Sequence, residues 1–178
     1  NECMNLSLTN SAHFTGDGAV MPLDKSQLVF IHNSANQGLD CMRPSMLFSG
    51  LETILRNQNR QNADLRLFEF GMTYQRSSKT FVGEHGSGTD TSFSMGKHLA
   101  LFMTGAHSSE SWQPGAKKSV DFFTLKSYVV NLLTRFGISG YQETILQEDP
   151  YQYAVKYHRG AQELVTLGAI QLEKKKKM

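Results

Sequence analysis

A glycine-rich stretch is the first pattern in this sequence that could do chemistry. Gly83–Gly88 (GEHGSG) has the composition of a loop whose backbone N–H groups cradle a phosphate. The Walker pattern requires GK[ST] at the opening of a helix, and the dinucleotide pattern requires GxGxxG between a strand and a helix. Neither order is present and no helix is predicted to follow, so we interpret the stretch as part of a hairpin loop.

Histidines and cysteines show no metal-binding spacing. There is no HExxH, no predicted helix carries two histidines four residues apart, and no CxxC is present. The sequence therefore predicts no metal site. The six histidines are His13, His32, His85, His98, His107 and His158.

Two acidic or nucleophilic candidates remain. Arg43 could lower the pKa of Cys41 and activate it as a thiolate, but we favour a small apolar residue packed at the entrance of a helix. Glu69 could form a carboxylate pair with Asp64. Two cations, Arg60 and Arg66, lie close enough along the chain to neutralise that pair structurally.

Two amphipathic helices are predicted to position these side chains. Pro44 suits a first helical turn, and apolar residues follow it at spacings of three and four, which predicts about four turns ending at 62–64. The strongest helical pattern covers 120–136. There Asp121 lies at the favourable positive end of the helix dipole, and Gly137 follows as a stop signal.

Alternation with period two predicts the strands, which we expect to form one antiparallel sheet with helices on one face, an α+β fold. We expect 65–75 to pair with 97–104 across a polar hairpin loop over 77–94. Phe68, Phe70, Met72 and Tyr74 should share one strand face. The other predicted strands are 4–9, 28–31, 151–157 and 163–172.

Composition and charge narrow the class of protein. A length of 178 residues predicts one domain, and 39% hydrophobic residues exclude intrinsic disorder. The net charge of +2 comes from Lys174–Lys177, since residues 1–173 hold 14 cations against 16 anions. The body is therefore not a basic nucleic-acid-binding surface. No apolar run is long enough for a membrane span and no secretory signal is visible, which predicts a cytoplasmic protein.

The ends of the sequence predict an excised piece. The first residue is Asn1 rather than Met, and the chain stops just after a lysine run that follows a strand pattern. We therefore expect residues 1–178 to be a single domain of a longer protein, truncated at both ends.

Three segments share one order and frame with a known family. They are 41–47 (CMRPSML), 59–71 (NRQNADLRLFEFG) and 120–126 (VDFFTLK). They resemble the MRPSLL, NR–N–D–RLFEIG and DFFDLKG patterns of the β subunit of bacterial phenylalanine–tRNA ligases. The likeness continues into the closing strands around Gly168. A departure is Asn33–Asn36 (NSAN), where the family usually has an NPLS turn.

This resemblance implies a non-catalytic module similar to the catalytic module of class II aminoacyl-tRNA synthetases. Active enzymes carry an RxE motif whose arginine binds ATP. Arg76 falls at that arginine, but Ser78 occupies the glutamate position, and the third class II motif has no match. The resemblance therefore implies no catalytic or cofactor-binding residue, with Arg76 as a vestigial motif position.

Partners are implied in the same way. The family implies a catalytic α subunit in an (αβ)₂ assembly, with tRNA, ATP and magnesium bound by the parent complex and no cofactor in this segment. We expect α-subunit contacts at apolar residues left exposed on the helices and at Phe122 or Phe123. The alternatives are an active class II-like adenylate-forming ligase using Arg76, and a free-standing nucleic-acid-binding domain using Lys174–Lys177.

Overall fold

The structure is a computed structural model that describes residues 1–16, 18–32, 36, 38–83, 86–107, 119–147 and 150–170, without side chains at 78–83 and 86–91. The chain divides into two compact units, Asn1–Thr104 and Gly105–Met178. The described part is α+β, with two α-helices and small antiparallel sheets. Neither of its helices is long and apolar enough to span a membrane.

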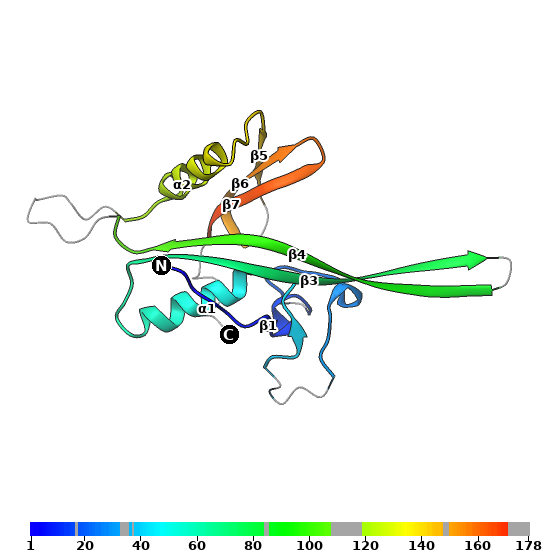
Figure 1. Ribbon diagram of the computed structural model, residues 1–178. Helices are drawn as coiled ribbons and strands as arrows, with labels where there is room; N and C mark the ends of the chain where they lie inside the picture. The colour runs from blue at the N-terminus through cyan, green and yellow to red at the C-terminus, as the bar shows by residue number, and fades with distance from the viewer. Residues whose placement is uncertain are drawn as a thin grey trace, which may run out of the picture. The chain divides into compact units, whose positions relative to one another are not determined.

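A long antiparallel hairpin dominates the first unit. It consists of β3 (Leu65–Gly83) and β4 (Gly86–Thr104), drawn in green in Figure 1, with a register that runs from Leu65 opposite Thr104 to Gly83 opposite Gly86. The predicted antiparallel pair is confirmed. The predicted loop over 77–94 is wrong, because polar Ser and Thr residues there continue the ladder of backbone hydrogen bonds.

The two faces of this hairpin differ in burial. Phe68, Phe70, Met72 and Tyr74 share one face, as predicted, and Phe70 is still 68% exposed there. Successive side chains alternate between faces, so Leu65 and Glu69 lie on the other face, where both are buried. That second face is the one on which the N-terminal elements pack.

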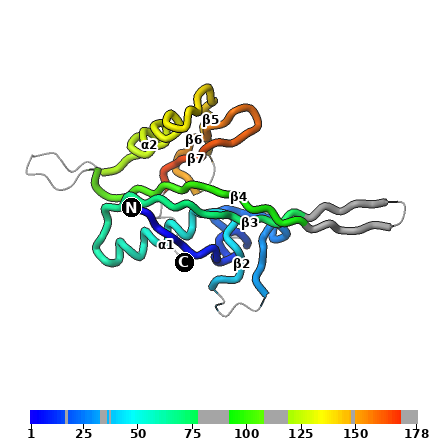
Figure 2. The backbone as a smooth tube through the Cα atoms, viewed as in Figure 1, coloured from blue at the N-terminus to red at the C-terminus, as the bar shows by residue number. Residues whose placement is uncertain are grey.

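Helix α1 (Leu47–Gln58) confirms the first predicted helix with a later start. Pro44 precedes it, so the expected placement of Pro44 in the first turn is wrong. The helix packs closely on β4, since a Cβ added at Gly50 would overlap the Phe102 ring. Figure 2 shows α1 and the N-terminal segment on the same side of the hairpin.

Irregular chain builds the rest of the first unit around a small aromatic core. Among its described residues, the regular elements are β1 (Leu8–Thr9), which pairs with β2 (Cys41–Met42), and two 3₁₀ helices, η1 (Ser11–His13) and η2 (Lys25–Gln27). The strand predicted over 4–9 is therefore reduced to two residues, and the one over 28–31 to a single bridge between Phe30 and Cys41. The core residues are Phe14, Leu28 and Phe48.

The second unit combines one helix with a three-stranded sheet. Helix α2 (Phe122–Arg135) confirms the strongest helical pattern, and Asp121 Oδ1 caps it by accepting from Thr124 N at 2.8 Å. Gly137, at φ 69°, follows its end. The sheet has the order β5 (Gln142–Leu146), β6 (Tyr151–Arg159), β7 (Gln162–Ile170), which confirms the last two predicted strands and adds β5. Within the described ranges the strands form three separate sheets in place of the single predicted one.

Candidate functional site

A buried ion pair joins Arg43, which directly follows β2, to Glu69 on β3 in the first unit. Arg43 Nη1 donates to Glu69 Oε1 at 2.9 Å, and the two side chains are only 3% and 2% exposed. The same Nη1 donates to Ser49 Oγ at 3.1 Å, and Arg43 Nε donates to the Met72 carbonyl at 3.0 Å. The guanidinium is therefore held on three sides.

The N-terminal segment completes this network. Asn5 donates to Glu69 twice, from Nδ2 to Oε2 at 2.7 Å and from its backbone N to Oε1 at 3.3 Å. Thr53 Oγ1 in turn donates to Asn5 Oδ1 at 2.6 Å. Both carboxylate oxygens of Glu69 thus accept hydrogen bonds, which is how a buried charge is compensated inside a protein.

Sequence reasoning assigned the wrong partners to Glu69. The cation beside it is Arg43, from a segment 26 residues earlier, and not Arg60 or Arg66. Position 69 lies on the buried strand face together with Leu65. That alternation was the available signal that Glu69 needs a buried cation from another element.

Cys41 is a packed residue and not a nucleophile. It is fully buried, and its Sγ lies 3.6 Å from the Thr9 carbonyl. Burial, followed by the nearby Asp40 carboxylate, raises the pKa of Cys41 to about 12. Arg43 is engaged with Glu69 instead. The interpretation as a packed residue is confirmed, and the thiolate alternative is wrong.

Arg76 lies on the exposed face of the hairpin. It pairs with Phe93 and follows Tyr74 on the same face, opposite to the face that carries Glu69. The Ser78 side chain lies outside the described residues, as do His85 and the lysine run Lys174–Lys177. The structure therefore does not bring Arg76 together with the buried carboxylate.

The described histidines are dispersed. His13 stacks on Phe48 with ring centroids 4.4 Å apart, and His158 Nε2 lies 2.9 Å from Thr144 Oγ1. Within the described ranges no three His, Cys, Asp or Glu side chains gather around a possible metal position.

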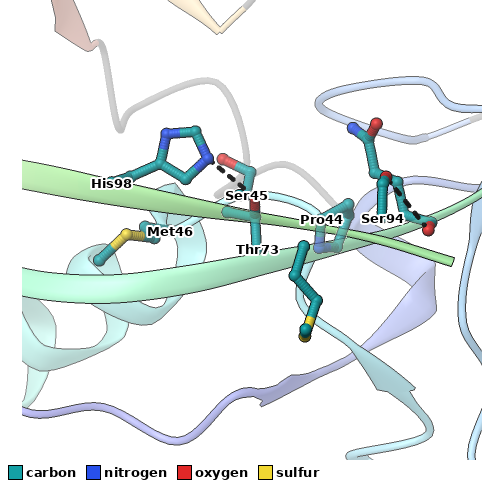
Figure 3. A pocket seen from close by; sticks show the side chains of 9 residues that line it. Pro44, Ser45, Met46, Thr73, Ser94 and His98 are labelled. Carbon is teal, nitrogen blue, oxygen red and sulfur yellow. Dashed lines mark hydrogen bonds between the residues drawn. The ribbon is translucent and has the colours of Figure 1, made fainter.

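A groove of about 400 Å³ lies beside the buried network, on the same face of the hairpin. Two cross-strand pairs, Thr73 with Gly96 and Gln75 with Ser94, form its floor on β3 and β4. Thr73 Oγ1 lies 2.9 Å from His98 Nε2, a contact drawn as a dashed line in Figure 3. The Ser94 hydroxyl donates to the Gln75 carbonyl at 3.4 Å. The lining residues are Pro44, Ser45, Met46, Thr73, Gln75, Ser94, Met95, Gly96 and His98.

The network holds the wall of this groove in place. Arg43 immediately precedes the wall residues Pro44 and Met46, and its carbonyl accepts from Tyr74 N at 2.9 Å. A Cβ added at Gly71 would meet the Arg43 guanidinium and the Met46 methyl group, so the connection from β2 to α1 lies flat on the strand. Sequence reasoning missed the groove. Its signal was a pair of glycines, Gly71 inside the strand predicted over 65–75 and Gly96 directly before the strand predicted over 97–104.

Comparisons with known proteins agree with the resemblance. A family model described as "Phenylalanyl tRNA synthetase beta chain CLM domain" matches residues 1–172. Proteins named "Phenylalanine--tRNA ligase beta subunit" are 35% identical in Bacteroides thetaiotaomicron and 34% identical in Bacteroides fragilis, over 96% of this chain in both cases. The one in Porphyromonas gingivalis is 30% identical over 97% of the chain.

The match covers nearly all of this chain but only a small part of each relative. The chain spans only about a fifth of the length of these curated relatives, 20% for the two Bacteroides proteins and 21% for the Porphyromonas protein. The family model, in contrast, matches almost the whole of the present chain. The motif segments at 41–47, 59–71 and 120–126 all fall inside that match. The chain therefore belongs to the family of phenylalanyl-tRNA synthetase β chains.

Proposed function

We propose that this chain is a non-catalytic core module of the β subunit of a phenylalanine–tRNA ligase, with a fold related to the class II synthetase catalytic module. The observation that carries the proposal is the family match across residues 1–172. The α+β content and the antiparallel hairpin agree with such a module. Its role is to support assembly with the catalytic α subunit and to help position tRNA for ATP-dependent attachment of phenylalanine.

The state of the charged residues supports a role without catalysis. Arg43 and Glu69 neutralise each other in a buried network, so neither is available to a nucleotide. Arg76 stands on the exposed, largely apolar face of the hairpin, where no partner side chain of opposite charge shares the described part of the strand pair. We infer that Arg76 is a vestigial motif position. ATP and magnesium then belong to the parent complex, in the cytoplasm.

Helix α2 supplies a surface for the α subunit. Leu125, Tyr128, Leu132 and Phe136 follow each other at spacings of three and four on one flank, beside the buried positions Val129 and Leu133. Tyr128 is 50% exposed and Phe136 is 68% exposed. Of the two neighbouring phenylalanines, Phe122 is buried and only Phe123 is exposed. Obligate interfaces between subunits are richer in apolar groups than ordinary surface, which favours this flank.

The relatives' names support a heteromeric partner. Each is called a beta subunit, a name that implies an alpha subunit in the same protein. We extend this to the present chain as an (αβ)₂ assembly in which tRNA is bound by the whole complex.

Two activity measurements test the absence of catalysis. The chain alone, given ATP and phenylalanine, should show no pyrophosphate exchange above the buffer rate. In the reconstituted ligase, Arg76→Ala should leave the aminoacylation rate within a few-fold of the wild type, because the exposed Arg76 side chain is assigned no contact with ATP. Strong exchange by the chain alone, or a 100-fold loss in a folded Arg76→Ala complex, would reject the proposal.

A further inference from the structure

The groove between the β2–α1 connection and the hairpin has no role in the function proposed above. We propose that it binds an uncharged planar heterocycle of the size and chemistry of a nucleobase. All residues that line the groove belong to the first unit, so binding there does not require assembly with the α subunit.

The groove is held in shape before any ligand arrives. Its floor is a strand pair with continuous backbone pairing through Thr73–Gly96 and Gln75–Ser94. Its wall follows directly on Arg43, whose guanidinium is fixed by Glu69 and by the Met72 carbonyl. A volume of about 400 Å³ lies in the range of roughly 300–1,000 Å³ found for small-molecule sites. A preformed site loses little conformational entropy on binding.

The charge of the lining excludes anionic and cationic ligands. None of its residues is Asp, Glu, Lys or Arg, and His98 is the one titratable side chain among them. A phosphate or carboxylate in a protein site is normally bound by charge-assisted hydrogen bonds, and a metal ion needs carboxylate, thiolate or several imidazole ligands. This lining offers neither, so it suits an uncharged molecule.

The shape and polarity of the lining favour a flat ring with polar edges. Gly96 adds no side chain of its own to the floor, where the hydrogen-bonded His98 and Thr73 side chains occupy the space beside it. Pro44 and Met46 supply an apolar wall in which the thioether can contact an aromatic ring. Around them, the Gln75 amide carries donors and an acceptor, and the Ser94 hydroxyl, which donates to the Gln75 carbonyl, can still accept a hydrogen bond. A nucleobase presents donors and acceptors in the plane of its ring, whereas a hydrocarbon ring would use only the apolar wall.

Gly96 provides a specific way to fill the groove. A Cβ added there would lie 2.5 Å from His98 Nε2 and 3.1 Å from Thr73 Oγ1, so Gly96→Ala must displace that hydrogen-bonded pair. Gly18 offers a matched control in the same unit, because a Cβ there meets no atom within 4 Å. Gln75→Ala is a second variant, which removes the amide from an exposed position without touching the fold.

The test is a titration of the ¹⁵N-labelled 178-residue chain, followed by the backbone amide signals of Thr73, Gln75, Gly96 and His98. Adenosine, guanosine, cytidine, uridine, phenylalanine and a short single-stranded RNA are added separately. We expect at least one nucleoside or the RNA to shift these signals saturably. Gly96→Ala should weaken binding at least tenfold and Gln75→Ala about threefold, while Gly18→Ala should bind as the wild type does.

The titrations distinguish two ligands that could carry such a ring, a free nucleoside and an unpaired base of RNA. Shifts with a free nucleoside support a small-molecule ligand, and shifts with the RNA alone support an unpaired base of RNA. The proposal is overturned if neither moves these amides, if phenylalanine moves them as strongly as the nucleosides, or if folded Gly96→Ala binds as tightly as the wild type. Should Gly96→Ala not fold, unchanged binding by Gln75→Ala overturns it.

Discussion

The ion pair between Arg43 and Glu69 is the residue-scale feature on which the first unit depends. A buried charge is tolerated only when a counter-charge and hydrogen bonds replace the water that it loses. Here the network brings one group from each of four segments to a single place, through Asn5, Arg43, Ser49 and Glu69. The packing of these segments in the first unit is therefore stabilised by polar contacts as well as by the small aromatic core.

Removing one partner should be far more damaging than removing both. Arg43→Ala is expected to lower the free energy of unfolding by about 3–5 kcal/mol, because the Glu69 carboxylate stays buried without its cation. The double variant Arg43→Met/Glu69→Leu should lose less. Urea unfolding followed by circular dichroism measures both, with the exposed Arg76→Ala as a control within about 0.5 kcal/mol of the wild type. A loss below 1 kcal/mol for Arg43→Ala would show that the network contributes little.

Cys41 should respond to pH as a deeply protected thiol. Its pKa is raised to about 12, so at pH 8 it should resist alkylation in the native chain and react fully in urea. Between pH 9 and 12 the unfolded thiol ionises and the native one does not. The unfolded state then binds fewer protons, so this group lowers stability as the pH rises. Mass spectrometry after pulsed alkylation measures the reactivity, and rapid native labelling of Cys41 at pH 8 would contradict the assignment.

At the scale of elements, a side-chain cap sets the start of α2. Asp121 Oδ1 accepts from the backbone N of Thr124 at 2.8 Å and from its hydroxyl at 2.7 Å. The cap satisfies one of the backbone N–H groups that a helix leaves unpaired in its first turn. In the same first turn, Phe122 is buried and Phe123 is exposed.

Loss of that cap should weaken the second unit. Asp121→Ala is expected to cost about 0.5–2 kcal/mol of stability, since the N–H of Thr124 loses its acceptor, whereas Asp121→Asn should retain most of it. Thermal unfolding of the two variants, compared by circular dichroism, provides the measurement. Equal melting temperatures for Asp121→Ala and the wild type would mean that the cap does not hold the helix.

The elements that sequence predicted well are those with long, regular patterns. The hairpin over 65–104, the helix over 120–136 and the final strand pair each repeat a period often enough to specify their type. Short strands were predicted less well. Met4 and Leu6 fit the apolar–polar alternation of a strand, but both side chains are exposed and neither residue belongs to β1. The polar stretch 77–94 failed in the other direction, because pairing depends on a partner strand that local composition does not reveal.

The candidate site was less predictable than the fold for the same reason. Cys41 could be recognised as a packed residue, but the contact between Arg43 and Glu69 joins segments 26 residues apart, and spacing alone does not identify it. The groove depends on the register that places Thr73 opposite Gly96. Such register is a tertiary property, set by the hairpin as a whole.

At the scale of the whole molecule, this chain matches a fifth of proteins that are named as subunits. A module of that kind should keep apolar surface for its neighbours. The exposed apolar side chains of the described part include Phe70, Phe93 and Met95 on one face of the hairpin, and Tyr128 and Phe136 on the flank of α2. We propose that the flank of α2 contacts the α subunit.

The affinity between the catalytic α subunit and the complete β subunit tests this account most directly. Analytical ultracentrifugation would compare Tyr128→Asp with Ser127→Asp, which adds the same charge at an exposed neighbouring position on another side of α2. Burying an unpaired carboxylate at an apolar interface is unfavourable. We predict association at least tenfold weaker for Tyr128→Asp and within twofold of the wild type for Ser127→Asp. Undiminished association of a folded Tyr128→Asp subunit would contradict the account.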